Sequence, residues 1–135
     1  MTKAQRDELI AHAEEEAPNE CCGYARGRDG ELERTFRAQN PRRSPYGYEL
    51  DSKSLLAAND FDDEGYQVAI YHSHPRSPAE PSQTDINLAR LGDSDQPAFP
   101  GTLYLIVGVK DPEDDLRLWS IVGNDVQQVE LEVTD

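Results

Sequence analysis

The sequence predicts one domain of the α/β or α+β class, built on a mixed, largely antiparallel sheet flanked by helices. Its 135 residues suit a single domain spanning residues 1–135 with a modest core. Helix and strand patterns alternate in the first part of the chain, and three strand patterns in succession close it as an antiparallel meander. Hydrophobic residues make up 36% and charged residues 30%, a balance that favours a folded globular protein over a disordered one.

A helix is expected at the start of the chain. Thr2 and Gln5 have the spacing of a capping box. The helix must end near Pro18, and one face of it carries the apolar residues Leu9, Ile10, Ala13 and Ala17. His12 lies in an acidic part of this helix, so we expect it to be solvated.

A β-hairpin follows the first helix. The segments Cys22–Arg28 and Glu31–Ala38 have strand patterns, and they flank Asp29-Gly30, a dipeptide typical of tight hairpin turns. A further short strand is expected at Gly47–Leu50.

Two more helices are predicted by caps followed by apolar residues. The earlier one begins with Asp51 or Ser52 as its cap and carries Leu55, Leu56 and Ala58. The later one opens at Ser82 or Thr84 and is stopped by Gly92. Its apolar residues are Ile86, Leu88, Ala89 and Leu91.

The remaining strands are marked by apolar runs and turn signals. Gln67–His74 has the pattern of a buried strand. The closing meander consists of Thr102–Lys110, Leu116–Val122 and Val126–Val133, separated by turns at Asp111-Pro112 and Gly123-Asn124. Trp119 is expected to pack within this meander rather than to bind a ligand.

Composition narrows the partners and the compartment. The net charge of −14 argues against nucleic acid, because phosphate binding needs a surplus of Lys and Arg; it suits a cationic partner, a neutral partner or none. No apolar stretch approaches the roughly 18–20 residues that span a membrane, and the polar N-terminus has no apolar signal core. The adjacent Cys21-Cys22 pair forms no disulfide framework, which favours a reducing, cytoplasmic setting.

The segment YHSHPRSPAEPSQTD, residues 71–85, contains two of the three histidines. Because side chains alternate along a strand, His72 and His74 face the same way at the end of a buried strand. Asp85 lies in the expected first turn of the next helix, where the helix dipole favours a carboxylate. Either these are histidines at a strand end with no shared role, or two nitrogens and one oxygen form a zinc site with an open fourth position, the catalytic arrangement.

An open zinc site needs a group that moves protons. Glu20 is the candidate, since it follows the helix-ending Pro18 and opens an apolar stretch where a carboxylate is an odd choice for a core strand. The competing interpretation is a solvated surface glutamate.

These residues resemble the signature of the JAMM (MPN-plus) zinc metalloprotease family. That signature is a glutamate near the N-terminus, then H-x-H, a ten-residue gap and Asp, with Ser three positions before the Asp. The matching residues are Glu20, His72, His74, Ser82 and Asp85, and a P-x-E-x-C-G pattern matches at Pro18, Glu20, Cys22 and Gly23. The order of the elements also agrees over nearly the whole chain, and no ligand is missing.

The resemblance implies a JAMM/MPN fold, which is cytidine-deaminase-like, and zinc-dependent hydrolysis of an amide bond. His72, His74 and Asp85 would hold one Zn²⁺. Glu20 would take a proton from a zinc-bound water and deliver it to the leaving nitrogen, and the Ser82 hydroxyl would stabilise the oxyanion. Ser82 also has a competing role as helix cap.

The resemblance also implies the substrate class. The family cleaves after the C-terminal Gly-Gly of ubiquitin-like proteins, and the compact prokaryotic members, such as the Mec-like peptidases, act on ubiquitin-like sulfur carriers. The expected partner is therefore such a carrier or its conjugate, with either a single amino acid or a protein lysine as leaving group. The alternatives are a desampylase-like deconjugating enzyme and a non-catalytic MPN interaction module. Family members dimerise variously, so a homodimer is compatible with the sequence. A deaminase is disfavoured, because neither Cys21-Cys22 nor HSH supplies its zinc ligands.

Overall fold

A six-stranded sheet with the order β2-β1-β3-β4-β5-β6 forms the centre of the molecule. The computed structural model describes residues 1–111 and 115–135. The strands are β1 (Cys22–Arg28), β2 (Glu31–Ala38), β3 (Gln67–His74), β4 (Leu103–Gly108), β5 (Leu116–Val122) and β6 (Asp125–Val129). Strands β3 and β4 are parallel, and the other neighbouring pairs are antiparallel. The predicted mixed, largely antiparallel sheet is confirmed.

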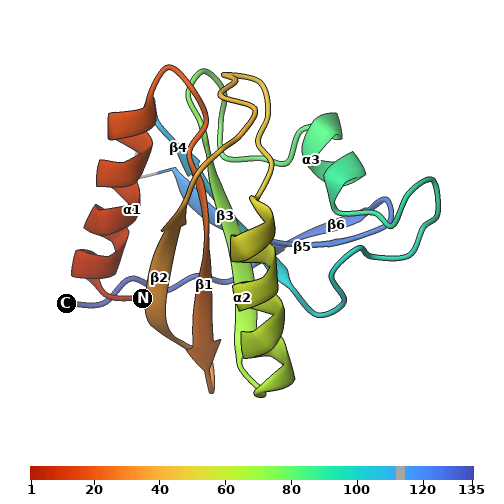
Figure 1. The fold of residues 1–135 in the computed structure, drawn as a ribbon. Coiled ribbons are helices and arrows are strands. Elements are labelled where there is room, and N and C mark those ends of the chain that lie inside the picture. The colour runs from red at the N-terminus through yellow and green to blue at the C-terminus, as the bar shows by residue number, and fades with distance from the viewer. Residues whose placement is uncertain (112–114) are drawn as a thin grey trace.

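Helices cover both faces of this sheet (Figure 1). Helix α1 (Lys3–Glu16) lies on one face, and α2 (Ser52–Asp63) and α3 (Gln83–Leu88) lie on the other. The predicted caps of the first two helices are present: Thr2 and Gln5 form a capping box, and the Asp51 side chain accepts a hydrogen bond from the Ser54 N–H. Each cap satisfies backbone N–H groups that the first helical turn leaves free, which stabilises a helix by about 1 kcal/mol.

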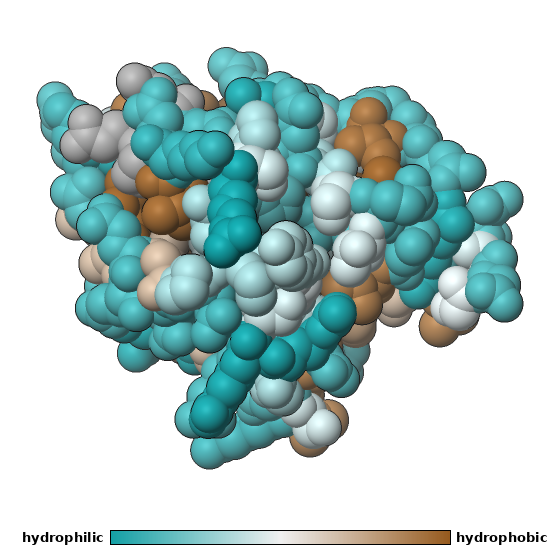
Figure 2. Space-filling model, turned by 90° about the horizontal axis from the view of Figure 1, so that it is seen from above, coloured by the Kyte–Doolittle hydropathy of each residue, from teal (hydrophilic) through white to brown (hydrophobic). Residues whose placement is uncertain are grey.

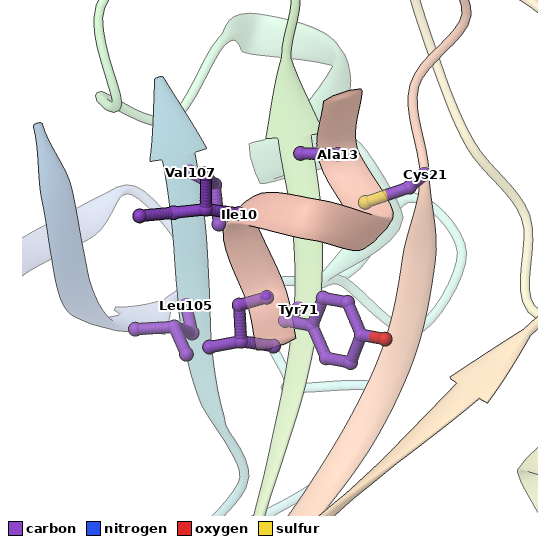
Figure 3. Close-up of a cluster of buried hydrophobic side chains, with 7 residues drawn as sticks. Ile10, Ala13, Cys21, Tyr71, Leu105 and Val107 are labelled. Atoms are coloured by element: carbon purple, nitrogen blue, oxygen red, sulfur yellow. The ribbon is translucent and has the colours of Figure 1, made fainter. Parts of the chain in front are cut away.

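Each face of the sheet has its own apolar core. Leu9, Ile10 and Ala13 of α1 pack against a cluster on the sheet that contains Cys21, Tyr71, Leu105 and Val107 (Figure 3). The opposite face buries Cys22, Tyr48, Leu50, Ile70, Ala89, Tyr104 and Ile121. Because side chains alternate along a strand, Cys21 and Cys22 enter different cores, and both are free thiols. Burial raises the pKa of each thiol to about 12, as expected of packing residues rather than reactive ones.

The histidine in α1 is buried, and the expectation that His12 is solvated is wrong. His12 is 3% exposed, and its Nδ1 lies 2.7 Å from the Tyr71 hydroxyl. The residue is three positions after Leu9 and therefore belongs to the buried face of the helix. The acidic residues next to His12 in the sequence lie on other faces of the helix, so they do not predict whether His12 is exposed.

The predicted strand at Gly47–Leu50 is absent. Gly47 makes only an isolated bridge to Ser44, and residues 48–50 have no strand partner. The Asn40 side chain takes the place of a neighbouring strand: its amide donates to the Gly47 carbonyl, and its oxygen accepts from the Glu49 N–H. The loop is therefore held by one side chain rather than by a ladder.

Three predicted elements end earlier than expected, and one of them, β4, stops at Gly108 instead of Lys110. Helix α3 stops at Leu88 instead of Leu91, because the Leu91 N–H donates to the Gln96 carbonyl in the following loop. Strand β6 stops at Val129, because the tail turns to pair with the N-terminus, where Thr2 and Thr134 form a bridge. The predicted turns at Asp29-Gly30 and Gly123-Asn124 are confirmed, whereas Pro112 of the predicted Asp111-Pro112 turn lies outside the described residues. Within the described parts of the chain, the helices are too short and too polar to cross a bilayer.

Candidate metal centre

The end of β3 brings two imidazoles together. His72 and His74 project from the same face of the strand, and their Nε2 atoms are 3.2 Å apart. Strand β1 lies on one side of β3 and the parallel strand β4 on the other. Both rings are nearly inaccessible, with 1% and 4% exposed. Figure 2 looks onto this end of the molecule, which is covered largely by hydrophilic side chains.

Asp85 reaches the same point from the first turn of α3. Its two carboxylate oxygens lie 3.1 Å from His72 Nε2 and 2.9 Å from His74 Nε2. Ser82 fixes this position by a capping box: its hydroxyl accepts from the Asp85 N–H, and its own N–H donates to Asp85 Oδ2. The helix cap and the carboxylate are thus parts of one arrangement.

Hydrogen bonds and stacking orient the two imidazoles. His74 Nδ1 donates to the Pro78 carbonyl at 2.7 Å, which in the neutral ring leaves the lone pair on Nε2 and directed at the cluster. The His72 ring stacks on Tyr48 with a centroid distance of 4.3 Å and an interplanar angle of 21°. The contributions of Tyr48 and Pro78 to the site were not predicted from the sequence.

The three side chains fit a divalent cation. Their ligand atoms all lie within 4.8 Å of one another, and the closest contacts of 2.9–3.2 Å approach the ~3.3 Å edge of a tetrahedron with metal–ligand distances of ~2.0 Å. Two neutral imidazole nitrogens and one carboxylate are a donor set that Zn²⁺ accepts.

The charges within the cluster depend on one another. Burial disfavours the ionised form of Asp85, but His72, His74 and the Ser82 N–H outweigh burial and hold the pKa of Asp85 far below its ordinary value. Burial lowers the pKa of His72. Burial is the largest single effect on His74 and lowers its pKa, but the hydrogen bonds to Asp85 and Pro78 and the nearby negative charges together outweigh burial and raise the pKa overall. A buried carboxylate therefore stays ionised here, as a metal ligand must.

Glu20 lies beside this cluster because of the strand register. Cys22 pairs with His72, and Cys21 hydrogen-bonds with Ser73, so continuing the antiparallel ladder by one residue places Glu20 opposite His74. The main chain of Glu20 is fixed on its other side by the Ser44 carbonyl and the Asn40 amide. The expected site residue is therefore held from both sides.

The Glu20 side chain is buried beside the candidate ligands. It is 5% exposed, and its Oε1 has no hydrogen-bond partner within the described part of the chain. Burial, followed by the charge of Asp85, raises the pKa of Glu20 to about 8. The alternative of a solvated surface glutamate is therefore wrong. A buried carboxyl with a pKa near neutrality can both accept and return a proton.

Ser82 is placed differently from the other candidate residues. Its hydroxyl is used as a cap for α3, and the side chain is exposed to solvent. The structural role expected for Ser82 is confirmed, and its role toward an oxyanion stays a prediction.

Comparison with known proteins identifies the family. Residues 2–122 match the family described as prokaryotic homologs of the JAB domain. The chain belongs to this family. Among the relatives, a CysO-cysteine peptidase from Mycobacterium tuberculosis is 35% identical over 134 residues, covering 94% of this chain and 85% of the relative. A desampylase from Haloferax volcanii is 30% identical over 141 residues, covering 95% of this chain and 91% of the relative.

Solved structures agree with the family. A protein from Desulfitobacterium hafniense is 31% identical with a TM-score of 0.77, and the match covers 99% of this chain and 91% of the other. A JAB1/MPN domain protein from Archaeoglobus fulgidus has a TM-score of 0.60, covering 99% and 94%; at 18% identity this likeness shows the shared fold alone. The family match and the peptidase relatives identify the protein as a hydrolase, and the solved structures show that it has the JAB/MPN fold.

Proposed function

We propose that this protein is a zinc-dependent peptidase that hydrolyses the amide bond after the C-terminal Gly-Gly of a ubiquitin-like sulfur carrier. The observation that supports this most directly is the buried cluster of His72, His74 and Asp85 with Glu20 beside it, whose buried Oε1 has no hydrogen-bond partner among the described residues. A non-catalytic interaction module would gain nothing from burying these groups, and burial of uncompensated polar atoms costs free energy. The substrate class is supported by the relatives, which are named as a CysO-cysteine peptidase and a desampylase.

Each residue has a defined task in the proposed reaction. His72, His74 and Asp85 would hold the zinc ion, which when bound lowers the pKa of a water molecule and polarises the scissile carbonyl. The Glu20 carboxylate takes a proton from the attacking water and returns it to the leaving nitrogen. The Ser82 hydroxyl accepts a hydrogen bond from the Asp85 N–H, so its own hydrogen is free to be donated to the developing oxyanion.

A cleavage assay followed by mass spectrometry tests this proposal. One substrate is a ubiquitin-like sulfur carrier whose C-terminal Gly-Gly is extended by a single cysteine. The other is the same carrier joined through its Gly-Gly to a lysine side chain of a second protein. The zinc-loaded protein should release the leaving group directly after Gly-Gly, a chelator should stop the reaction, and added zinc should restore it.

The two substrates separate the proposal from its main alternative. Faster release of cysteine supports an exopeptidase acting on a sulfur carrier. Faster release of the lysine-linked protein supports deconjugation, the activity suggested by the similarity to a desampylase. Cleavage at an unchanged rate by metal-free protein would overturn the zinc mechanism, and failure to cleave either substrate would favour the interaction module.

A further inference from the structure

The loop between His74 and α3, residues 75–82, is anchored at an unusual point. Loops generally lie on the surface with water as their partner. Here Ala79 is completely buried, and side chains take up both of its backbone polar groups. The Ala79 N–H donates to Asp115 Oδ2 at 2.8 Å, and the Ala79 carbonyl accepts from Trp119 Nε1 at 2.9 Å.

The two anchoring side chains come from β5 and from the residue just before it. Asp115 immediately precedes β5 and Trp119 lies within it, four residues later, so both face the same side as the metal cluster. Arg117 is two residues from each of them and therefore lies on the same face of the sheet. It forms ion pairs with Asp115 and with Glu80 of the loop. These ion pairs are partly exposed and contribute little by themselves, so the contacts with Ala79 are the main anchor.

Gly108 makes room for this anchor. A Cβ atom at Gly108 would lie 2.2 Å from Asp115 Oδ2, so a larger residue would displace the carboxylate. Gly108 is the last residue of β4 and pairs with His74 in the parallel ladder. The position that lets Asp115 reach Ala79 is therefore also adjacent to the candidate ligand.

The anchored residue, Ala79, is bonded directly to Pro78, whose carbonyl orients His74. That carbonyl accepts from His74 Nδ1. The Ala79 N–H that Asp115 binds and the Pro78 carbonyl that His74 binds belong to the same peptide group. A planar peptide group cannot tilt at one end without moving the other.

We propose that Asp115 and Trp119 are positioning residues that together fix the tautomer of His74. Asp115 holds this peptide group itself, and Trp119 holds the next one through the Ala79 carbonyl, so that Ala79 is fixed on both sides. With the Pro78 carbonyl held in place, the His74 proton stays on Nδ1 and the lone pair stays on Nε2, toward the ion. The inference rests on the proposed role of His74 as a metal ligand. In a purely structural role, the same contacts would stabilise the loop and leave the imidazole unaffected.

The first test reads the tautomer directly in metal-free protein by ¹⁵N NMR of the histidine rings, at a pH above the raised pKa of His74 so that the ring is neutral. The parent protein should show His74 as the Nδ1–H tautomer. Trp119→Phe removes the donor and keeps an aromatic ring, and Asp115→Leu removes the acceptor. Both should give a mixture of the two tautomers. Asp115→Asn keeps an oxygen acceptor for the Ala79 N–H and should restore the parent spectrum, whereas Gly108→Ala should behave like Asp115→Leu.

The second test measures affinity for zinc alone, by competition with a chelator at a temperature where circular dichroism shows every variant folded. Trp119→Phe and Asp115→Leu should weaken zinc binding by about 10–100-fold, the usual effect of removing a group that orients a metal-binding histidine. The matched control is Ile121→Val, two residues along β5 in the same core as Trp119. It should lower the melting temperature by a few degrees and leave zinc affinity unchanged.

The readouts separate this inference from the proposed function. The tautomer is observed without metal or substrate, so it tests the anchor even if the protein cleaves neither carrier. An unchanged His74 tautomer in folded Trp119→Phe and Asp115→Leu would overturn the inference. So would a loss of zinc affinity in Ile121→Val equal to the loss in Trp119→Phe, because affinity would then follow stability alone.

Discussion

Neighbouring residues of β3 face two environments that treat polar groups differently. On the α1 side, the Tyr71 hydroxyl lies in hydrogen-bonding contact with His12, and the Ser73 hydroxyl accepts from the Cys21 N–H. On the other side, His72 Nδ1 and Glu20 Oε1 are buried with no hydrogen-bond partner in the described residues. Buried polar atoms in native proteins are nearly always paired, so the unpaired side is the one that calls for a functional explanation.

The comparison shows that burying a histidine says little about its role. His12 and His72 are both nearly inaccessible, and burial lowers the pKa of both. His12 meets a single tyrosine that satisfies it, whereas His72 meets another imidazole and a carboxylate at one point. The difference lies in whether the lone pairs are used up within the protein.

The largest effect is expected on zinc content, from removing a candidate ligand on the face of β3 that carries His72 and His74. His74→Ala should reduce bound zinc from about one equivalent per chain to none, because two remaining ligands hold Zn²⁺ poorly. Metal analysis after dialysis measures this. Full zinc retention in a folded variant would show that the cluster is not the binding site.

Glu20→Gln should retain zinc and lose activity by about 10²–10⁴-fold, the usual contribution of a positioned acid–base group. The amide keeps the size of the side chain but cannot carry the proton to the leaving nitrogen. The parent and variant rates on the cysteine-extended carrier, measured with metal content confirmed, test this. A rate within twofold of the parent would remove Glu20 from the mechanism.

A third prediction concerns stability and pH in metal-free protein. Since burial raises the pKa of Glu20 to about 8, the folded state binds a proton that the unfolded chain releases near pH 4.5. The stability associated with this group is therefore present below pH 4.5 and is lost as the pH rises toward 8. Glu20→Gln removes that loss and should stabilise the protein at pH 9 by about 2 kcal/mol more than at pH 4, roughly half the full linkage value for such a shift.

Denaturant unfolding of the two proteins at pH 4, 6 and 9 measures this difference. A stability difference that does not change with pH would mean that the carboxyl group of Glu20 is solvated.

The smallest effect is expected on the α1 side. Tyr71→Phe removes the hydroxyl that pairs with His12 and leaves a buried nitrogen unpaired, which should cost about 1–2 kcal/mol of unfolding free energy. Activity and zinc content of the folded variant should stay at the parent level. A large loss of activity would mean that the two faces are coupled through β3, and would contradict the claim that only the face with the metal cluster has a functional role.

The ligand set could be predicted from the sequence because local rules position each member. Strand alternation aligns His72 with His74, and a helix cap places Asp85. The burial of Glu20 could be inferred only from its apolar surroundings. Its place opposite His74 depends on the β1–β3 register, which the sequence of neither strand shows by itself.

Other features depend on contacts between distant segments and were missed or predicted wrongly. The Gly47–Leu50 segment has a strand-like composition, but Asn40 organises it as a loop. Trp119 does pack on the meander core as expected, yet its indole also binds a carbonyl forty residues earlier. Hydrogen bonds between distant segments form only once the sheet is assembled, so no local sequence pattern predicts them.

The pairing of the two chain ends has a practical consequence. The N-terminal ammonium donates to the Glu132 carbonyl, and the Thr2–Thr134 bridge holds the tail against the start of α1. In Figure 1 both ends lie at the lower left, below α1, whereas β3 runs upward to the end that carries His72 and His74. A fluorescent reporter or a surface-coupling handle fused to either end would therefore leave the approach of a bulky substrate unobstructed, and one immobilised preparation could serve binding and turnover measurements alike.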